Sequence, residues 1–400
     1  MEETYRLDLN NLPIELKLIL DILQISDKVK SHQFSQELKD SNIDWEKFIS
    51  LVYHHRIYPQ VYTKLNKVHQ ALIPAQVIQR IENKYKKNTF NMLLLSAEME
   101  YVSKMFESAE VKMLVLKGPV LAEDLYGDIS LRTSNDLDIL ISISDLDRAE
   151  ALLIKEGYLK DDYFTSILGE WRWRHHHVTY FHPVKKVKLE LHWRLNPGPG
   201  AEPCFKDLWK RKRISCITKK PIYFLGREDL FLFLISHGAR HGWSRLRWLV
   251  DIHQLVEQDI DWNQIFLLIK KYQLEKISGK VLILASNLLG TNIKKEMISL
   301  VSNWRSKELG QKTIFYFENM INLHSEPLPT EISKYHQKYL FSLKTIKQKW
   351  IFIVSFLYPY PEDASTLQLP KNLHILYFLL RPFLWCWRKT KRSYALYRGI

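Results

Sequence analysis

The stretch Asp136-Leu137-Asp138-Ile139-Leu140-Ile141 decides the fold. Successive side chains of a β-strand point to opposite faces, so a strand here places Asp136 and Asp138 on one face and Leu137 and Ile139 on the other. Two negative charges so close together are costly without a cation, and hard carboxylate oxygens at this spacing suit Mg²⁺ bound to the phosphates of a nucleotide. A solvated strand end is the alternative interpretation.

A second strand with a polar face is expected from Val187 to Leu195, where apolar and polar residues alternate strictly. If this strand pairs beside the first, Glu190 adds a third carboxylate, and His192 or Arg194 is placed to meet phosphate. An edge strand that faces water is the alternative. The residues that share the polar face are Lys188, Glu190, His192 and Arg194.

Other elements complete a small α/β unit. Residues 112–116 predict a short buried strand, and Lys117-Gly118 joins it to a helix that extends to about Tyr126. Glycine lets the backbone and the helix N-terminus approach a phosphate. Arg132 is a cation for the same cleft or, alternatively, a surface charge. Residues 137–143 and 178–181 predict further strands, and residues 145–156 predict a helix.

Helical periodicity dominates on both sides of this unit, over residues 14–109 and from about residue 228 to the end. His237 and His241 are four residues apart on a predicted helix, so they share a face that lines the cleft or packs internally. A zinc site would need a third ligand at a suitable spacing, and the sequence shows none. The run His175-His176-His177 precedes a strand and is interpreted as structural.

The order and spacing of these motifs resemble the uncharacterised nucleotidyltransferase family of the polymerase-β-like superfamily. The matching segments are Leu116-Lys117-Gly118, Asp124-Leu125-Tyr126, Leu131-Arg132, Asp136-Leu137-Asp138-Ile139-Leu140 and Glu190-Leu191-His192-Trp193. The resemblance extends through the segment from His237 to Leu246, with Asp251, and to the closing segment from Leu376 to Pro382.

The resemblance implies an α+β fold. Its minimal nucleotidyltransferase core, a small mixed sheet with helices, would occupy residues 96–200 between helical regions at 1–95 and 201–400. Asp136 and Asp138 match the family's metal-binding pair, Glu190 matches its third acid, and Lys117-Gly118 matches the loop that holds the triphosphate. One departure concerns this loop, because Pro119 follows Gly118 and lacks a backbone N–H donor.

The implied activity is Mg²⁺-dependent (or Mn²⁺-dependent) transfer of a nucleoside monophosphate from an NTP such as ATP to an acceptor. A small molecule, a peptide natural product or a protein is the favoured acceptor. An RNA-directed enzyme and a non-catalytic basic helical scaffold are the alternatives. The residues expected to contact the nucleotide are Lys117, Gly118, Arg132, His192, Arg194, His237 and His241.

Composition limits the remaining classes. The 400 residues carry a net charge of +14, which suits partners that bear phosphate. Three cysteines without paired spacing argue against a disulfide scaffold or a zinc module, and the acidic N-terminus lacks a secretory signal, so we expect a cytoplasmic protein. The apolar stretch from Leu373 to Trp387 is interrupted by Arg381-Pro382, which favours a core helix, with contact to a membrane surface as the alternative.

Overall fold

A mixed seven-stranded sheet lies at the centre of the protein, in the order β3-β4-β5-β2-β1-β7-β6. The computed structural model describes residues 5–24, 42–65, 73–161, 166–323 and 327–398. β2 pairs antiparallel with β1 and parallel with β5, and β5 pairs antiparallel with β4. The strands are β1 Met113–Val115, β2 Asp136–Ile141, β3 Leu159–Lys160, β4 His177–His182, β5 Val187–His192, β6 Arg213–Ser215 and β7 Ile222–Phe224.

One face of the sheet is covered by α5 (Ala75–Ser108) and α7 (Leu146–Lys155). Alternation along β2 and β5 directs Leu137, Ile139 and Leu189 into a buried cluster with residues of these helices, such as Met99 and Leu153. This packing fixes the register, because a shift by one residue would turn the apolar set out of the core. The carboxylates of β2 therefore lie on the opposite face.

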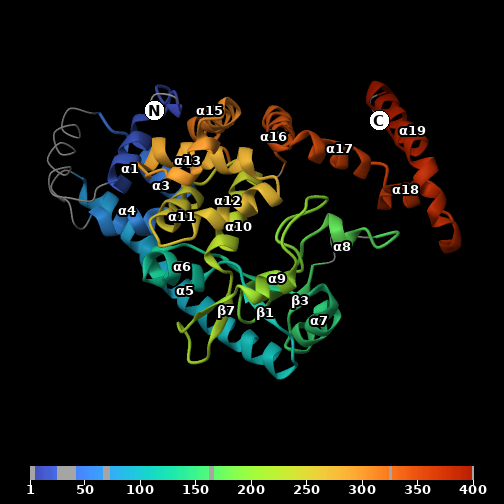
Figure 1. Cartoon of the computed structure of the whole chain (residues 1–400), viewed down its shortest axis with the longest axis horizontal. Helices are drawn as coiled ribbons and strands as arrows, with labels where there is room; N and C mark the ends of the chain where they lie inside the picture. The colour runs from blue at the N-terminus through green and yellow to red at the C-terminus, as the bar shows by residue number, and fades with distance from the viewer. Residues whose placement is uncertain (1–4, 25–41, 66–72, 162–165, 324–326, 399–400) are drawn as a thin grey trace.

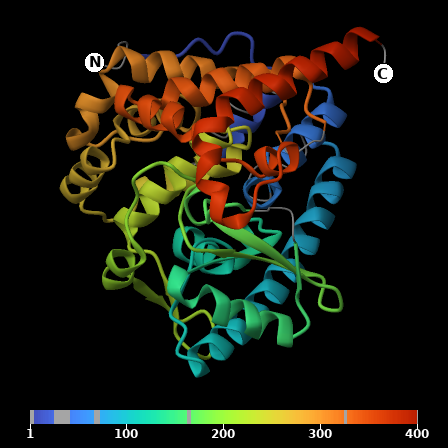
Figure 2. The ribbon, with the colours of Figure 1, turned by 90° about the vertical axis from the view of Figure 1, so that its right-hand side faces the viewer.

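The opposite face is turned towards α10 (Arg227–Arg240) and α11 (Leu246–Val256). Leu114 and Leu140 belong to the large core cluster that also contains Leu234 of α10 and Leu249 of α11. Figure 2 shows the sheet and α5 in the lower half of the molecule and the orange and red helices above them. The polar side chains of β2 and β5 thus lie between the sheet and the helical region.

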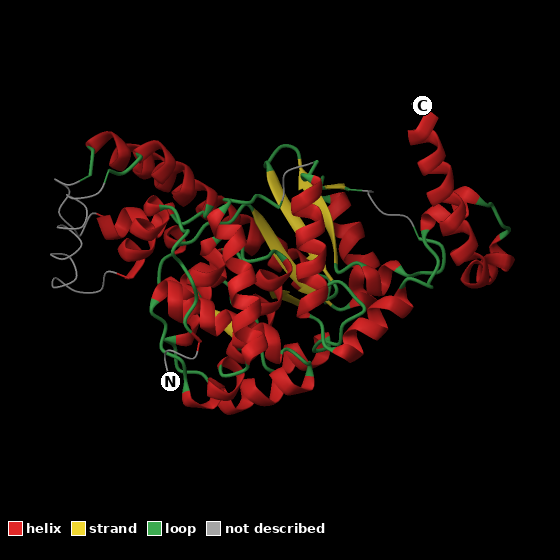
Figure 3. Cartoon of the chain, turned by 90° about the horizontal axis from the view of Figure 1, so that it is seen from above, coloured by secondary structure: helices red, strands yellow, loops and turns green. Residues whose placement is uncertain are grey.

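The remaining helices surround this centre. Figure 1 shows the N-terminal helices packed beside α11 and α13, whereas α18 and α19 lie at the far end of the molecule. Figure 3 shows the same separation from above. These helices are α1 Ile14–Gln24, α3 Trp45–His54, α4 Tyr58–Leu65, α6 Pro119–Tyr126, α8 Trp171–Arg174, α9 Phe205–Lys210, α12 Trp262–Lys271, α13 Glu275–Leu289, α14 Ile298–Val301, α15 Trp304–Glu318, α16 Thr330–Leu343, α17 Ile346–Ser355, α18 Pro361–Thr366 and α19 Tyr377–Arg398.

The predicted α+β fold with flanking helical regions is confirmed, and the differences lie at element ends and in strands that were not predicted. β5 ends at His192 rather than residue 195, because the backbone N–H groups of Trp193 and Arg194 both turn to the carbonyl oxygen of His176, at 3.0 and 3.3 Å. β3, β6 and β7 were not predicted, and β6 and β7 extend the sheet beyond residue 200. α5 runs across the expected boundary at residues 95 and 96. The three-unit division stays a prediction.

The C-terminal apolar stretch does not form a membrane-spanning segment. Among the described residues, no helix combines the length and the apolar character needed to cross a bilayer. α19 instead exposes Leu379, Phe383, Trp385 and Trp387, which differs from the expected core helix. Arg381 anchors this helix through a buried ion pair with Asp363 of α18.

Candidate active site

Strand pairing brings Asp138 and Glu190 side by side. β2 and β5 are parallel, and Asp138 is the direct partner of Glu190 in their register. Neighbouring strands of a sheet lie about 4.7–4.9 Å apart, so the two carboxylates share one small region. Asp138 is fully buried and Glu190 is half-buried. The expected grouping of these two acids is present in the structure.

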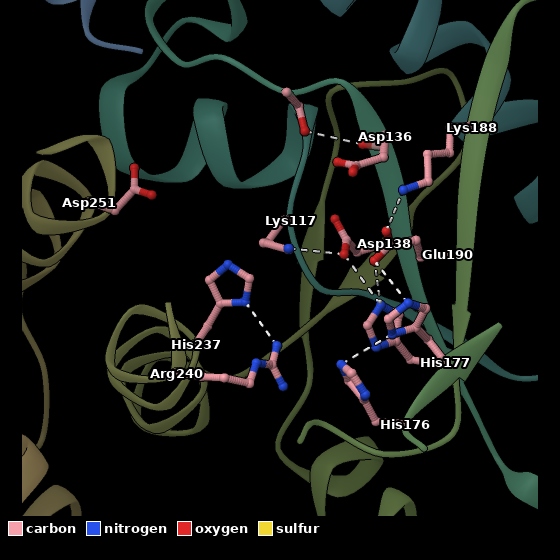
Figure 4. A network of polar contacts seen from close by, with 12 residues as sticks. Lys117, Asp136, Asp138, His176, His177, Lys188, Glu190, His237, Arg240 and Asp251 are labelled. Atoms are coloured by element: carbon pink, nitrogen blue, oxygen red, sulfur yellow. Dashed lines mark hydrogen bonds and ion pairs between the residues drawn. The ribbon is translucent and has the colours of Figure 1, made fainter. Parts of the chain in front are cut away.

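Positive groups surround the two carboxylates. Lys117 Nζ lies 3.0 Å from Asp138 Oδ1, and Lys188 Nζ lies 2.9 Å from Glu190 Oε1. His192 Nε2 lies between them, 3.3 Å from Asp138 Oδ1 and 3.5 Å from Glu190 Oε2. Figure 4 shows Lys117, Asp138 and Glu190 converging on one region. This arrangement offsets the charge of a buried acidic pair.

The pKa shifts follow from these contacts. Burial raises the pKa of Asp138, but the Lys117 charge and the His192 hydrogen bond outweigh it, so the net pKa lies below its ordinary value. Burial likewise opposes ionisation of Glu190, yet the hydrogen bond to His192 and the charge of His177 lower its pKa. The pKa of His192 is raised, because its contacts with both carboxylates outweigh burial. Asp138 and Glu190 are therefore held ionised.

Asp136 differs from the other two acids. It shares their face two residues before Asp138 and is partly exposed at the start of β2. Burial and the negative charge of Asp138 raise its pKa. Among the described residues, one group that could hold a metal ion contains carboxylates. It consists of Asp138, Glu190 and His192, whose ligand atoms lie within 4.8 Å of one another. Asp136 lies at the edge of this group.

The loop between β1 and α6 approaches the carboxylates from the neighbouring strand. The backbone N–H of Leu116 donates to the carbonyl oxygen of Asp138 at 2.9 Å, which places Lys117 beside the acid. Gly118 has φ +86° and ψ −145°, a conformation that side chains disfavour. A Cβ at this position would lie 3.8 Å from Leu137 Cδ2, so the backbone angles rather than lack of space require glycine.

Comparison with protein-family models gives a match over residues 41–290, to a family described as uncharacterised nucleotidyltransferases. The chain belongs to this family. It is therefore a nucleotidyltransferase, and the predicted family and enzyme class are confirmed. Searches of curated proteins and of solved structures gave no match.

Arg132 of this nucleotidyltransferase forms an ion pair with Asp251, which lies outside the carboxylate group. Its guanidinium Nε lies 2.9 Å from Asp251 Oδ1, and its Nη2 lies 2.9 Å from Asp251 Oδ2. Arg132 is 1% exposed and Asp251 is fully buried. Tyr126 donates a further hydrogen bond to Asp251 at 2.8 Å. The geometry gives Arg132 the role of joining the sheet region to α11, and its contact with nucleotide stays a prediction.

The other predicted nucleotide contacts are spread around the site. Arg194 turns to the following loop, with Nη2 2.8 Å from the carbonyl oxygen of Gly200 and Nε 3.3 Å from Glu202 Oε1. Together with Leu140 and Trp193, it lines a cavity of about 500 Å³. His237 is buried and its ring centroid lies 4.7 Å from that of His241. Burial, followed by the Lys117 charge, lowers the pKa of His237 well below its ordinary value.

From the sequence alone, Arg240 is either a phosphate-binding charge or part of a solvated basic face, and His176 and His177 are interpreted as structural. Arg240 extends from α10 towards Glu190 and Asp138, and its pKa is lowered by burial to about 10 despite the attraction of these acids. The antiparallel register that pairs His177 with His192 would have revealed the two histidines.

Proposed function

We propose that the enzyme holds Mg²⁺ (or Mn²⁺) with Asp136, Asp138 and Glu190 and transfers a nucleoside monophosphate from an NTP to an acceptor. Asp138 Oδ2 supports this proposal most directly, because it is buried and has no hydrogen-bond partner. A buried charged oxygen without a partner is costly, and such an oxygen is a natural ligand for a hard dication. When bound, Mg²⁺ would neutralise phosphate oxygens and act as a Lewis acid.

The surrounding residues supply the contacts that an NTP needs. The Lys117 ammonium has three N–H donors, so it can bond Asp138 and a phosphate oxygen at the same time. Arg240 Nη1 is buried without a hydrogen-bond partner near the acids, and a guanidinium suits bidentate contact with phosphate. We assign Lys117, Gly118 and Arg240 to the triphosphate. His192 and His237 line the same region.

The acceptor oxygen attacks the α-phosphorus of the NTP while the bond to pyrophosphate breaks. The acceptor must lose its proton, and Glu190 is either the general base or a further metal ligand. A carboxylate with a lowered pKa accepts a proton poorly and binds a cation well. These properties favour Glu190 as a ligand, in which case the proton of the acceptor passes to solvent water.

A small molecule, a peptide natural product or a protein is the acceptor that we favour, since families of this kind often serve as tailoring enzymes. The RNA-directed alternative follows from the net charge of +14. One assay separates the two: binding to RNA that vanishes steeply with salt and is not accompanied by incorporation of nucleotide would disfavour an RNA acceptor. Family membership removes the non-catalytic scaffold as a description of the whole chain.

The test is incorporation of labelled nucleotide with each NTP, Mg²⁺ and extracts that contain candidate acceptors, followed by mass spectrometry of the labelled species. Asp138→Asn is expected to abolish incorporation while thermal unfolding remains close to that of the wild type. Asp147→Asn, an exposed acid in the first turn of α7, is the matched control and is expected to be fully active. Full activity of Asp138→Asn would refute the assignment.

A further inference from the structure

Three histidines form a compact group beside the carboxylates. His177 begins β4 and pairs directly with His192 of β5, and His176 immediately precedes it. The ring centroids of His176 and His177 lie 4.3 Å apart, and those of His177 and His192 lie 4.8 Å apart. With one ring nitrogen taken from each residue, all three ligand atoms lie within 4.8 Å of one another.

His192 provides an independent indication of a ligand. It is 3% exposed, and its Nδ1 has no hydrogen-bond partner. Its Nε2 faces Asp138 and Glu190, so in the neutral ring the proton lies on Nε2 and Nδ1 keeps a free lone pair. A buried acceptor without a partner is unfavourable and requires an explanation.

The orientation of the His192 ring is one that metal-binding histidines adopt. A histidine ligand commonly donates its second N–H to a carboxylate, which fixes the ring and its tautomer. His192 meets this condition, and His177 Nε2 lies 3.8 Å from Glu190 Oε2 while its Nδ1 points to His176. The distance between His177 Nδ1 and His176 Nε2 is 3.1 Å. Two nitrogens bound tetrahedrally to zinc lie about 3.3 Å apart.

We propose that His176, His177 and His192 bind a transition-metal ion of the zinc class, at a position separate from that of the catalytic Mg²⁺. Imidazole nitrogens suit Zn²⁺, Co²⁺, Ni²⁺ or Cu²⁺, whereas Mg²⁺ prefers oxygen. Asp138 and Glu190 supply negative charge next to the ion. Three protein ligands leave a fourth position open, as in catalytic zinc sites.

The proposal is tested with the full chain after removal of the affinity tag and treatment with EDTA. Co²⁺ is the probe, because its visible absorption reports coordination by nitrogen, and Zn²⁺ is then added in competition. We expect one Co²⁺ per chain, displaced by Zn²⁺ but not by Mg²⁺. Absence of binding would overturn the proposal, whereas nucleotide incorporation with Mg²⁺ alone tests the proposed function separately.

Variants locate the ion. His176→Gln and His177→Gln are expected to weaken Co²⁺ binding by at least about 100-fold, since loss of an outer-shell partner alone costs 10–100-fold. His175→Gln is the matched control from the same run and is expected to bind as the wild type. Far-UV circular dichroism of the metal-free variants verifies folding. If both variants bind normally while Asp138→Asn does not, the ion belongs to the carboxylates and the proposal is refuted. Wild-type binding by all of these variants would equally refute it, and would leave the contact between His176 and His177 as an ordinary hydrogen bond.

Discussion

Replacement of Arg132 by glutamine separates a structural from a nucleotide-binding role for this residue. In the structure, Arg132 forms a bidentate ion pair with Asp251, and both side chains are excluded from solvent. Arg132→Gln would leave the Asp251 carboxylate buried, with the hydrogen bond from Tyr126 as its remaining charge-stabilising contact of those described above. Removal of one partner of a buried ion pair costs about 3–5 kcal/mol, and we expect a decrease in the free energy of unfolding of that size.

The assay is urea denaturation followed by far-UV circular dichroism. Lys312→Gln is the control, because Lys312 and Glu308 are 46% and 44% exposed at the surface of α15. An exposed pair contributes about 0–1 kcal/mol, so this variant should unfold like the wild type. The double variant Arg132→Gln, Asp251→Asn removes the unpaired charge and should recover part of the lost stability.

The kinetic measurement completes this test. If Arg132 acts only through Asp251, the folded Arg132→Gln enzyme retains the wild-type KM for NTP. Wild-type stability combined with a strongly raised KM would refute the reasoning, because it would mean that Arg132 binds phosphate and that the buried ion pair contributes little.

Three further predictions concern other regions. Arg240→Gln should lower kcat/KM for NTP by the equivalent of about 1.5–3 kcal/mol, the usual contribution of a charged hydrogen bond, and an unchanged kcat/KM would remove Arg240 from the site. Burial and the charge of Arg245 lower the pKa of His54 from 6.5 to about 4, so its stabilising contribution is complete above pH 6.5 and is lost as the pH falls towards 4. NMR titration of His54 measures this pKa, and His54→Gln should flatten the decline in stability over that range. Membrane contact by residues 373–392 predicts co-sedimentation with anionic vesicles that weakens when Trp385 and Trp387 are replaced by serine, whereas a chain that stays in the supernatant contradicts it.

The sequence was most informative where a local pattern carries the physical constraint. Alternation along β2 and β5 predicted which residues face the core and which face the site, because one buried face requires it. The proximity of Asp138 and Glu190 needed one assumption, that the two strands pair. The parallel register provides that pairing.

Long-range partners were beyond the same reasoning. Arg132 and Asp251 are 119 residues apart, and nothing near either residue indicates the other. His177 and His192 meet through an antiparallel register that a run of three histidines does not specify. β6 and β7 contain three residues each, too few to show a period of two. Each omission reflects a contact set by tertiary packing.

The Gly118-Pro119 pair and the position of Lys117 are best explained together. Pro119 occupies the first turn of α6, where its missing N–H would have had no helical partner, but a phosphate at this helix end loses one backbone donor. The Lys117 ammonium, 3.0 Å from Asp138 Oδ1, stands one residue before the glycine and keeps further N–H donors available. In the proposed triphosphate site, the loop would thus replace a backbone contact with a charged side chain that the buried carboxylate holds in place. Because that side chain is anchored by Asp138, the residue proposed to bind the metal also positions the residue proposed to bind the triphosphate.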